Sequence, residues 1–240
     1  MQELLIQSLE IDWNEIDARD YLRSIHAVQA LKRLAFHSPV TFFAGENGSG
    51  KSTLLEAIAV AYGFNPEGGT KNYSFSTYDS HSRLGEALRL VRGVRRADWG
   101  YFLRAESFYN VATQEESYAD PGHPSERYHQ KSHGESFLAL AQQEFRPQGL
   151  YLLDEPEAAL SPQRQMSLLV EIARCAAQGS QFIIASHSPI LLAMPEAEIL
   201  CFDADGVRPC TYEETDSYRI TKMFLDDRKR ILHHLLGGIE

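Results

Sequence analysis

Eight consecutive residues, Gly45–Ser52, have the types and the spacing that bind a phosphate group. They fit the pattern G-x-x-x-x-G-K-[ST]. The glycines let successive backbone N–H groups turn toward an anion, Lys51 can reach the outer phosphates of a nucleotide, and the hydroxyl of Ser52 is placed to bind Mg²⁺. The residues of the predicted loop, with the one that follows it, are Gly45, Glu46, Asn47, Gly48, Ser49, Gly50, Lys51, Ser52 and Thr53.

The segments on both sides of this loop favour the same interpretation. Residues 40–44 are a short apolar run rich in β-forming residues, which predicts a buried strand. Apolar residues then recur at helical spacing from Leu54 to Tyr62, and Gly63 marks the predicted helix end. A glycine-rich turn that merely precedes a helix would need neither the lysine nor the serine. We therefore expect a nucleotide site between a strand and the start of a helix.

Two adjacent carboxylates, Asp154 and Glu155, follow a second apolar run at residues 149–153. An aspartate at a strand end can hold Mg²⁺ opposite Ser52. Because neighbours on a strand alternate faces, we expect Glu155 to point elsewhere and to deprotonate an attacking water, a role worth roughly 10²–10⁴ in rate. A small-molecule kinase also uses a phosphate loop, but it does not explain Glu155 together with a histidine at the end of the next strand.

These motifs resemble those of ABC-type ATPases, most closely the stand-alone bacterial ATPases related to SMC and RecF heads. The resemblance covers roughly residues 4–236. It implies an α/β fold of the P-loop NTPase class in one domain, residues 1–240, with a mixed central sheet flanked by helices, a small antiparallel β region and a helical signature subdomain at about residues 80–148. The segments that carry it are Gly45–Ser52, Ser132–Ser136, Leu150–Glu155 and His187.

The resemblance also implies cofactors, partners and residue roles. It implies ATP with Mg²⁺, hydrolysis to ADP and phosphate, and a head-to-tail homodimer whose ATP-driven closure works an unidentified protein partner. Ser132 and Gly134 match the signature that would cover the γ-phosphate of the facing copy, and His187 matches the switch histidine. The implied catalytic residues are Glu155, His187 and Lys51, and the implied metal ligands are Ser52 and Asp154.

The chain departs from the family pattern at several positions. His133 and Glu135 replace a glycine and a glutamine of the transporter signature, and Ser161 stands where an aspartate is expected. The glutamine that usually joins the Mg²⁺ shell has two candidate replacements, Glu106 and Gln114. These departures keep open an alternative function, an ATP-gated binding switch with little turnover.

A predicted helix at residues 84–96 would carry one apolar and one basic face. The basic face could meet a phosphate backbone, and it is the one observation in favour of a DNA-maintenance ATPase; a solvated face explains it as well. The apolar residues are Leu84, Leu88 and Val91, and the basic residues are Arg89, Arg92 and Arg96.

Other segments have less specific patterns. Residues 13–38 predict short strands over the nucleotide side, with Tyr21 as a candidate to stack on the base. Residues 199–210 predict a hairpin around Asp205-Gly206, and Ile220–Leu236 one amphipathic closing helix. A helix starting at Pro162 has a predicted core face of Met166, Leu169, Val170 and Ala173.

Composition narrows the possible surroundings. The 240 residues carry a net charge of −10, which does not favour nucleic acid or anionic lipid as a general partner. Three cysteines without metal-ligand spacing predict reduced thiols. The first residues, Met1 to Asp12, carry no basic leader, and no apolar run approaches the ~20 residues of a membrane span. We expect a cytoplasmic protein that does not insert into membranes.

Overall fold

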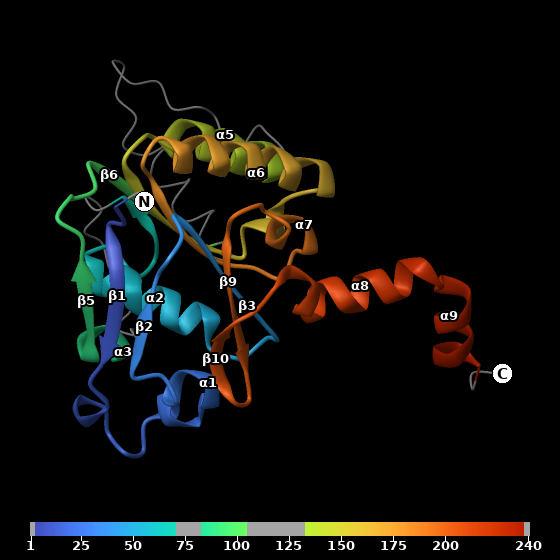
Figure 1. Ribbon diagram of the computed structural model, residues 1–240, viewed down its shortest axis with the longest axis horizontal. Coiled ribbons are helices and arrows are strands. Elements are labelled where there is room, and N and C mark those ends of the chain that lie inside the picture. The colour runs from blue at the N-terminus through green and yellow to red at the C-terminus, as the bar shows by residue number, and fades with distance from the viewer. Residues whose placement is uncertain (1–2, 71–82, 105–132, 238–240) are drawn as a thin grey trace.

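The computed structural model describes residues 3–70, 83–104 and 133–237, with side chains from residue 138 onward in the last range. A central sheet of seven strands, in the order β10-β9-β3-β8-β7-β6-β4, organises this part of the chain (Figure 1). Its five inner strands are parallel, and the two edge strands are antiparallel to their neighbours. The strands are β3 (Val40–Gly45), β4 (Gly69–Thr70), β6 (Trp99–Arg104), β7 (Gly149–Asp154), β8 (Gln181–Ala185), β9 (Glu198–Asp203) and β10 (Gly206–Pro209).

The parallel strands β3, β8 and β7 are neighbours, so their carboxyl ends lie at one edge of the sheet. Phe43 is in register with Ala185, and Ala185 with Asp154. This confirms the three predicted strands and the α/β class with a mixed sheet. The hairpin of β9 and β10 is also as predicted. In such sheets ligands bind outside the carboxyl ends of the strands, where the two motifs now meet.

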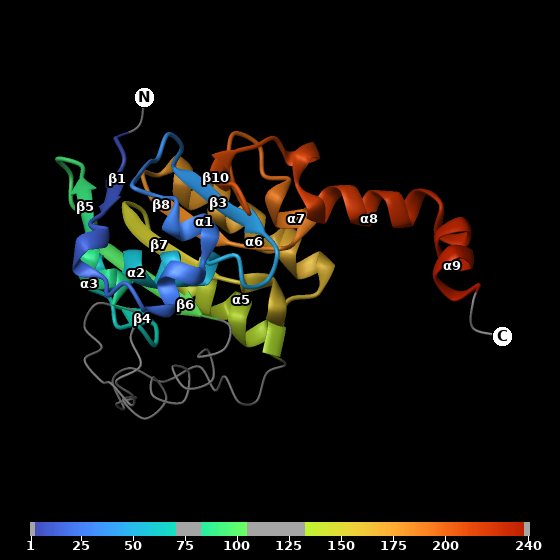
Figure 2. The same ribbon diagram turned by 90° about the horizontal axis from the view of Figure 1, so that it is seen from below.

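Helices cover both faces of the sheet (Figure 2). Side chains of each inner strand alternate between two cores: Phe43 packs on the side of α2, and Phe42 on the side of α6. One face is covered by α2 (Lys51–Tyr62), which ends at Gly63 in a left-handed conformation, as predicted. The other face carries α5 (His133–Glu144), α6 (Pro162–Ala177) and α7 (Pro189–Leu192).

A small antiparallel sheet of β2 (Arg33–Ala35), β1 (Ile6–Ile11) and β5 (Leu88–Arg92) packs against α2. It is the antiparallel region that the resemblance implied. The side chain of Gln181 joins it to the central sheet, because its amide accepts from the backbone N–H of Ile6 at 2.8 Å and donates to the carbonyl of Ile6 at 2.9 Å. Both residues are almost completely buried.

The predicted helix at residues 84–96 is wrong. The chain forms only one turn, α3 (Leu84–Ala87), and then the strand β5. Pairing with β1 overrides the helical spacing, and it places Arg89 opposite Glu10. The arginines therefore do not form a helical stripe, which removes the observation behind a DNA-maintenance role. The helical subdomain expected at residues 80–148 remains a prediction, since its middle lies outside the described residues.

The predicted short strands before β3 are mostly wrong as well. Only β2 is a strand in residues 13–38, and the rest forms η1 (Trp13–Glu15), η2 (Tyr21–Ser24) and α1 (His26–Gln29). The carboxylates of Asp12 and Asp20 cap the two 3₁₀ turns by accepting from backbone N–H groups two residues on. Such local bonds compete with strand pairing.

Two further predictions are wrong: the buried face of α6 and the reduced state of the three cysteines. Met166 and Val170 are exposed, while α6 buries Leu168 and Ile172, because the helix is turned so that this stripe faces the sheet. Cys201 and Cys210 are joined by a disulfide, since the hairpin brings them to a Cα separation of 6.0 Å; Cys175 is free and buried.

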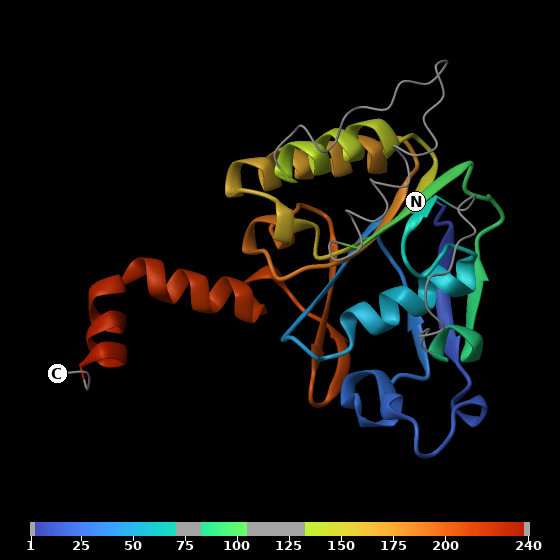
Figure 3. The same cartoon turned by 180° about the vertical axis from the view of Figure 1, so that it is seen from behind.

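The closing helix is broken in two. After η5 (Tyr212–Glu214), α8 (Asp216–Asp226) and α9 (Arg228–Leu236) meet at Asp227, whose carboxylate caps α9 by accepting from the N–H of Arg230. Both helices project away from the sheet in each view (Figures 1, 2 and 3), and neither buries a residue. No helix among the described residues is both long and apolar enough to cross a membrane.

Candidate nucleotide site

The phosphate loop connects β3 to α2 and has the backbone that its glycines allow. Gly45, Gly48 and Gly50 have φ of 146°, 80° and 97°, which other residues rarely adopt. A Cβ on Gly50 would lie 2.5 Å from side-chain atoms of Ile25 and Val28, so glycine also lets the loop pack against α1. The N-cap residue of α2 is Gly50, which has no side chain to cap the first N–H groups of the helix. N–H groups at such a helix start can bind an anion.

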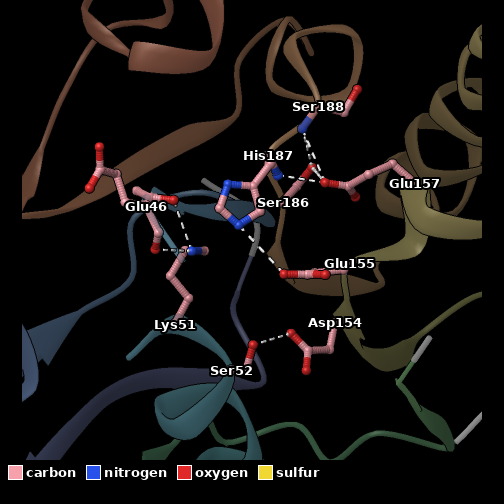
Figure 4. A network of polar contacts seen from close by, with 10 residues as sticks. Glu46, Lys51, Ser52, Asp154, Glu155, Glu157, Ser186, His187 and Ser188 are labelled. Carbon is pink, nitrogen blue, oxygen red and sulfur yellow. Dashed lines mark hydrogen bonds and ion pairs between the residues drawn. The ribbon is translucent and has the colours of Figure 1, made fainter. Parts of the chain in front are cut away.

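Lys51, the first residue of α2, folds back over the loop (Figure 4). Its Nζ donates to the carbonyl oxygens of Gly45 and Glu46, both at 2.8 Å. Burial lowers the pKa of its ammonium group, and the nearby carboxylates of Glu155 and Asp154 oppose that shift. The lysine thus places a desolvated cation, held by exchangeable carbonyl acceptors, beside the loop.

Ser52 and Asp154 come from separate elements and are in direct contact. The hydroxyl of Ser52 donates to Oδ1 of Asp154 at 2.7 Å. Oδ2 of Asp154 lies 3.8 Å from Nε of Arg104. Nη1 of the same arginine forms an ion pair with Oε2 of Glu56 at 2.7 Å. Sequence reasoning missed Arg104, although it ends β6 in register with Asp154. The arginine places a positive charge next to this carboxylate.

Glu155 points away from Asp154 for a reason other than the predicted strand alternation. The strand β7 ends at Asp154, and Glu155 has φ of 49° in the left-handed region, while its N–H still donates to the carbonyl of Ala185 at 2.9 Å. Such a conformation is uncommon for a residue with a side chain and tends to occur at functional sites. The turn aims the carboxylate at His187, and Oε1 lies 3.5 Å from Nε2 of that ring.

His187 begins the turn after β8, and its ring is half-buried. Burial lowers its pKa, the positive charge of Lys51 lowers it further, and Glu155 opposes both. The imidazole is therefore predominantly neutral at neutral pH. In a neutral ring one nitrogen donates a hydrogen bond and the other accepts one. Which nitrogen does which depends on where the proton sits.

A second carboxylate, Glu157, lies under this turn (Figure 4). Its Oε1 accepts from the hydroxyl of Ser186 at 2.9 Å, from the backbone N–H of His187, and from the N–H of Ser188 at 3.1 Å. The sequence analysis did not single it out. Its position two residues after Glu155 was the available signal.

Three cavities adjoin the phosphate loop. One of about 680 Å³ is open and is lined by Glu46, Asn47, Glu155, Glu157, Ala158 and His187. A second, of about 340 Å³, lies on the other side, between Ser24–Ala27, the loop and Asp216 at the start of α8. The third, of about 300 Å³, lies between Glu46, His187 and the beginning of α8. A ligand bound at the loop could therefore extend into any of these three cavities.

Not every predicted site residue can be placed. Ser132, Glu106 and Gln114 lie outside the described residues. Gly134 is in the first turn of α5. Tyr21 is 60% exposed and lines none of the three cavities, so its stacking role stays a prediction.

Two family models match separate parts of the chain. One is described as an AAA domain and matches residues 21–117; the other is described as "AAA domain, putative AbiEii toxin, Type IV TA system" and matches residues 135–193. The first contains the phosphate loop, and the second contains Asp154, Glu155 and His187. The resemblance to P-loop ATPases is confirmed. These matches indicate nucleotide binding and hydrolysis as the general activity.

Solved structures give only distant likenesses, and no curated protein matches the chain significantly. An SMC head domain from Thermotoga maritima is 16% identical, with a TM-score of 0.45, over 88% of this chain and 99% of its own. An ATP-binding cassette of an ABC transporter is 14% identical, with a TM-score of 0.43, over 95% and 97%. A putative metal-chelate type ABC transporter is 17% identical, with a TM-score of 0.43, over 80% of each chain. Likenesses at this level do not distinguish between functions.

Proposed function

We propose that this P-loop ATPase binds ATP with Mg²⁺ between two copies of the chain, arranged head to tail, and that hydrolysis reopens the pair and so drives a protein partner. The observation that carries the proposal is the convergence of three strand ends on one edge of the sheet. Ser52 contacts Asp154 there, Glu155 faces His187 beside an open cavity, and Lys51 lies close enough to feel the charges of Asp154 and Glu155.

The phosphate loop would bind the phosphates of the nucleotide through its backbone and Lys51. The uncapped N–H groups of α2 supply donors, and the partial positive charge of the helix start adds attraction. Lys51 would exchange the carbonyls of Gly45 and Glu46 for phosphate oxygens. An ammonium group that is already desolvated binds a phosphate strongly, because little water has to be removed from it.

Ser52 and Asp154 fit Mg²⁺ by their chemistry. Both offer hard oxygen atoms, and they lie within 2.7 Å of each other. Mg²⁺ usually takes one or two carboxylates and completes its shell with water and substrate phosphates. The metal would supply charge neutralisation of the phosphates.

Glu155 would accept the proton of the attacking water, since its carboxylate is partly exposed and lines the open cavity. His187 would contact the γ-phosphate by donating a hydrogen bond to it from the neutral ring. The second copy would close the cavity with the segment that contains Ser132 and Gly134, as the family resemblance implies.

Trapping the closed pair tests this proposal. Glu155→Gln keeps the shape of the side chain but removes the base, so it should bind ATP, lower turnover by at least ~10²-fold, and run as a dimer only with ATP and Mg²⁺. Light scattering after size-exclusion chromatography measures the mass. A Glu155→Gln protein that stays monomeric with ATP and still hydrolyses it would refute the proposal.

Phosphate release separates the ATPase from the alternative of a binding switch with little turnover. The wild-type protein should release phosphate well above a Lys51→Ala control, whose outer-phosphate contact is lost. Turnover equal to that control, together with ATP-dependent dimers, would favour the switch.

A further inference from the structure

Glu157 accepts three hydrogen bonds from the turn that carries His187. One oxygen, Oε1, receives three donors from three consecutive residues, Ser186, His187 and Ser188. Two of the donors are backbone N–H groups. The carboxylate therefore fixes the direction of the main chain at His187, and this direction decides where the ring points.

The same turn is fixed from its other side. The hydroxyl of Ser188 donates to the amide oxygen of Gln165 at 2.5 Å, and the N–H of Ser186 donates to the carbonyl of Phe43 at 3.1 Å. His187 lines the open cavity, and Nε2 of its ring lies 3.5 Å from Oε1 of Glu155. Glu157 is the link between this turn and the one that carries Glu155.

Packing alone does not explain a carboxylate at this place. Its second oxygen is buried and has no hydrogen-bond partner among the described residues. Burial raises the pKa of Glu157, while the hydrogen bonds from the N–H of His187 and the hydroxyl of Ser186 oppose that shift. A buried acidic group with an unpaired oxygen lowers the stability of the folded protein. A role for the three-donor contact therefore explains this carboxylate better than packing does.

We propose that Glu157 is a positioning residue that holds His187 against Glu155, so that contact with the γ-phosphate and activation of the water depend on one rigid unit. The hydrogen bonds of Glu157 support the placement of His187, and the effect on turnover rests on the proposed ATPase function. Glu157 itself does not touch substrate in this account.

Turnover tests the catalytic half. Glu157→Ala removes the acceptor for three donors and should lower kcat by about 10–100-fold with KM for ATP changed less than about threefold, because the phosphate loop is untouched. Glu157→Gln keeps one acceptor oxygen in the same place and should recover most of kcat. Glu171→Ala, which removes a carboxylate of α6 that pairs with Arg174 and lines none of the three cavities beside the phosphate loop, should behave as wild type.

A double-mutant cycle separates positioning from general damage. In a His187→Ala background Glu157→Ala should cause little further loss of kcat, since there is no ring left to hold. Losses that multiply, or a Glu157→Ala protein with wild-type kcat, would overturn the proposal.

A measurement without turnover keeps the placement testable if the ATPase proposal fails. The ring of His187 should titrate by NMR below the ordinary histidine pKa of 6.5 in the wild type, with Lys51 and Glu155 facing it. In Glu157→Ala the freed ring should become more exposed, and its pKa should move up toward 6.5. Glu157→Gln should keep the wild-type value. An unchanged titration in folded Glu157→Ala protein would contradict the placement, whatever the ATPase assay shows.

Discussion

Lys51 is held by the phosphate loop itself. Its two acceptors are main-chain carbonyls of that loop, and the group is buried. The contacts are therefore exchangeable for phosphate oxygens with little movement of the main chain. The same holds for Ser52, whose hydroxyl donates to Asp154.

Replacing Lys51 by methionine should separate folding from binding. Lys51→Met removes a desolvated charge along with two hydrogen bonds, so the unfolding free energy without ligand should change by no more than about 1 kcal/mol. Binding to the native state should stabilise the wild type by about 2.7 kcal/mol at 100 times Kd. Thermal unfolding with ATP and Mg²⁺ should show this gain for the wild type and not for the variant. An equal gain in both proteins would remove Lys51 from the binding site.

His187 should make stability depend on pH in a defined direction. Its folded pKa lies below the ordinary 6.5, so near that pH the unfolded chain binds the proton more readily than the folded one. As the pH falls below about 6.5, the wild type should lose stability relative to His187→Gln, until the folded ring also titrates. Denaturant unfolding of both proteins between pH 8 and pH 5 measures the difference. A difference that is constant, or that reverses, would contradict the burial of the ring.

At the scale of elements, a side-chain amide links the two sheets. Gln181 satisfies both backbone groups of Ile6, and water has no access to either residue. Gln181→Leu keeps much of the volume and leaves a donor and an acceptor buried, so it should destabilise the protein by about 2–4 kcal/mol. Equilibrium unfolding in urea measures this, with Gln163→Leu on the exposed start of α6 as the matched control. A loss no larger than that of the control would show that the sheets do not need the bridge.

Sequence periodicity was sufficient where one local signal decided the structure. The strands β3, β7 and β8 are continuous apolar runs, and α2 begins and ends at glycines, so both motifs could be placed at one edge of the sheet. Hence the sequence could predict that five site residues lie close together, while their roles stay predictions. These residues are Lys51, Ser52, Asp154, Glu155 and His187.

Periodicity failed where a distant partner decided. Residues 88–92 have helical spacing but pair with β1, which lies some 80 positions earlier in the chain. Met166 and Val170 fit an apolar helical stripe as well as Leu168 and Ile172 do, and only the sheet selects between the stripes. Glu157 was missed for the same reason, because its three donors follow another strand. The spacing of residues within a short segment does not reveal contacts of this kind.

At the scale of the whole molecule, the C-terminal helices are an appendage of the fold. The helices α8 and α9 extend away from the sheet (Figure 3), and α9 has its main contacts with α8 alone. Ile220, Leu225 and Leu235 are between 60% and 71% exposed. The start of α8 behaves differently, since Asp216 lines two of the cavities beside the phosphate loop. Only the base of this appendage is therefore part of the site.

Deleting α9 should consequently leave the fold intact. Removal of residues 228–240 uncovers no buried side chain of the described protein, so the unfolding free energy should change by less than about 0.5 kcal/mol. Leu192→Ala, at a buried position of α7, should cost about 2–5 kcal/mol and serves as the positive control. Urea unfolding of the three proteins measures both effects. A loss near that of Leu192→Ala would mean that α9 packs against the body or against a second copy in solution, because only a buried contact produces a change of that size.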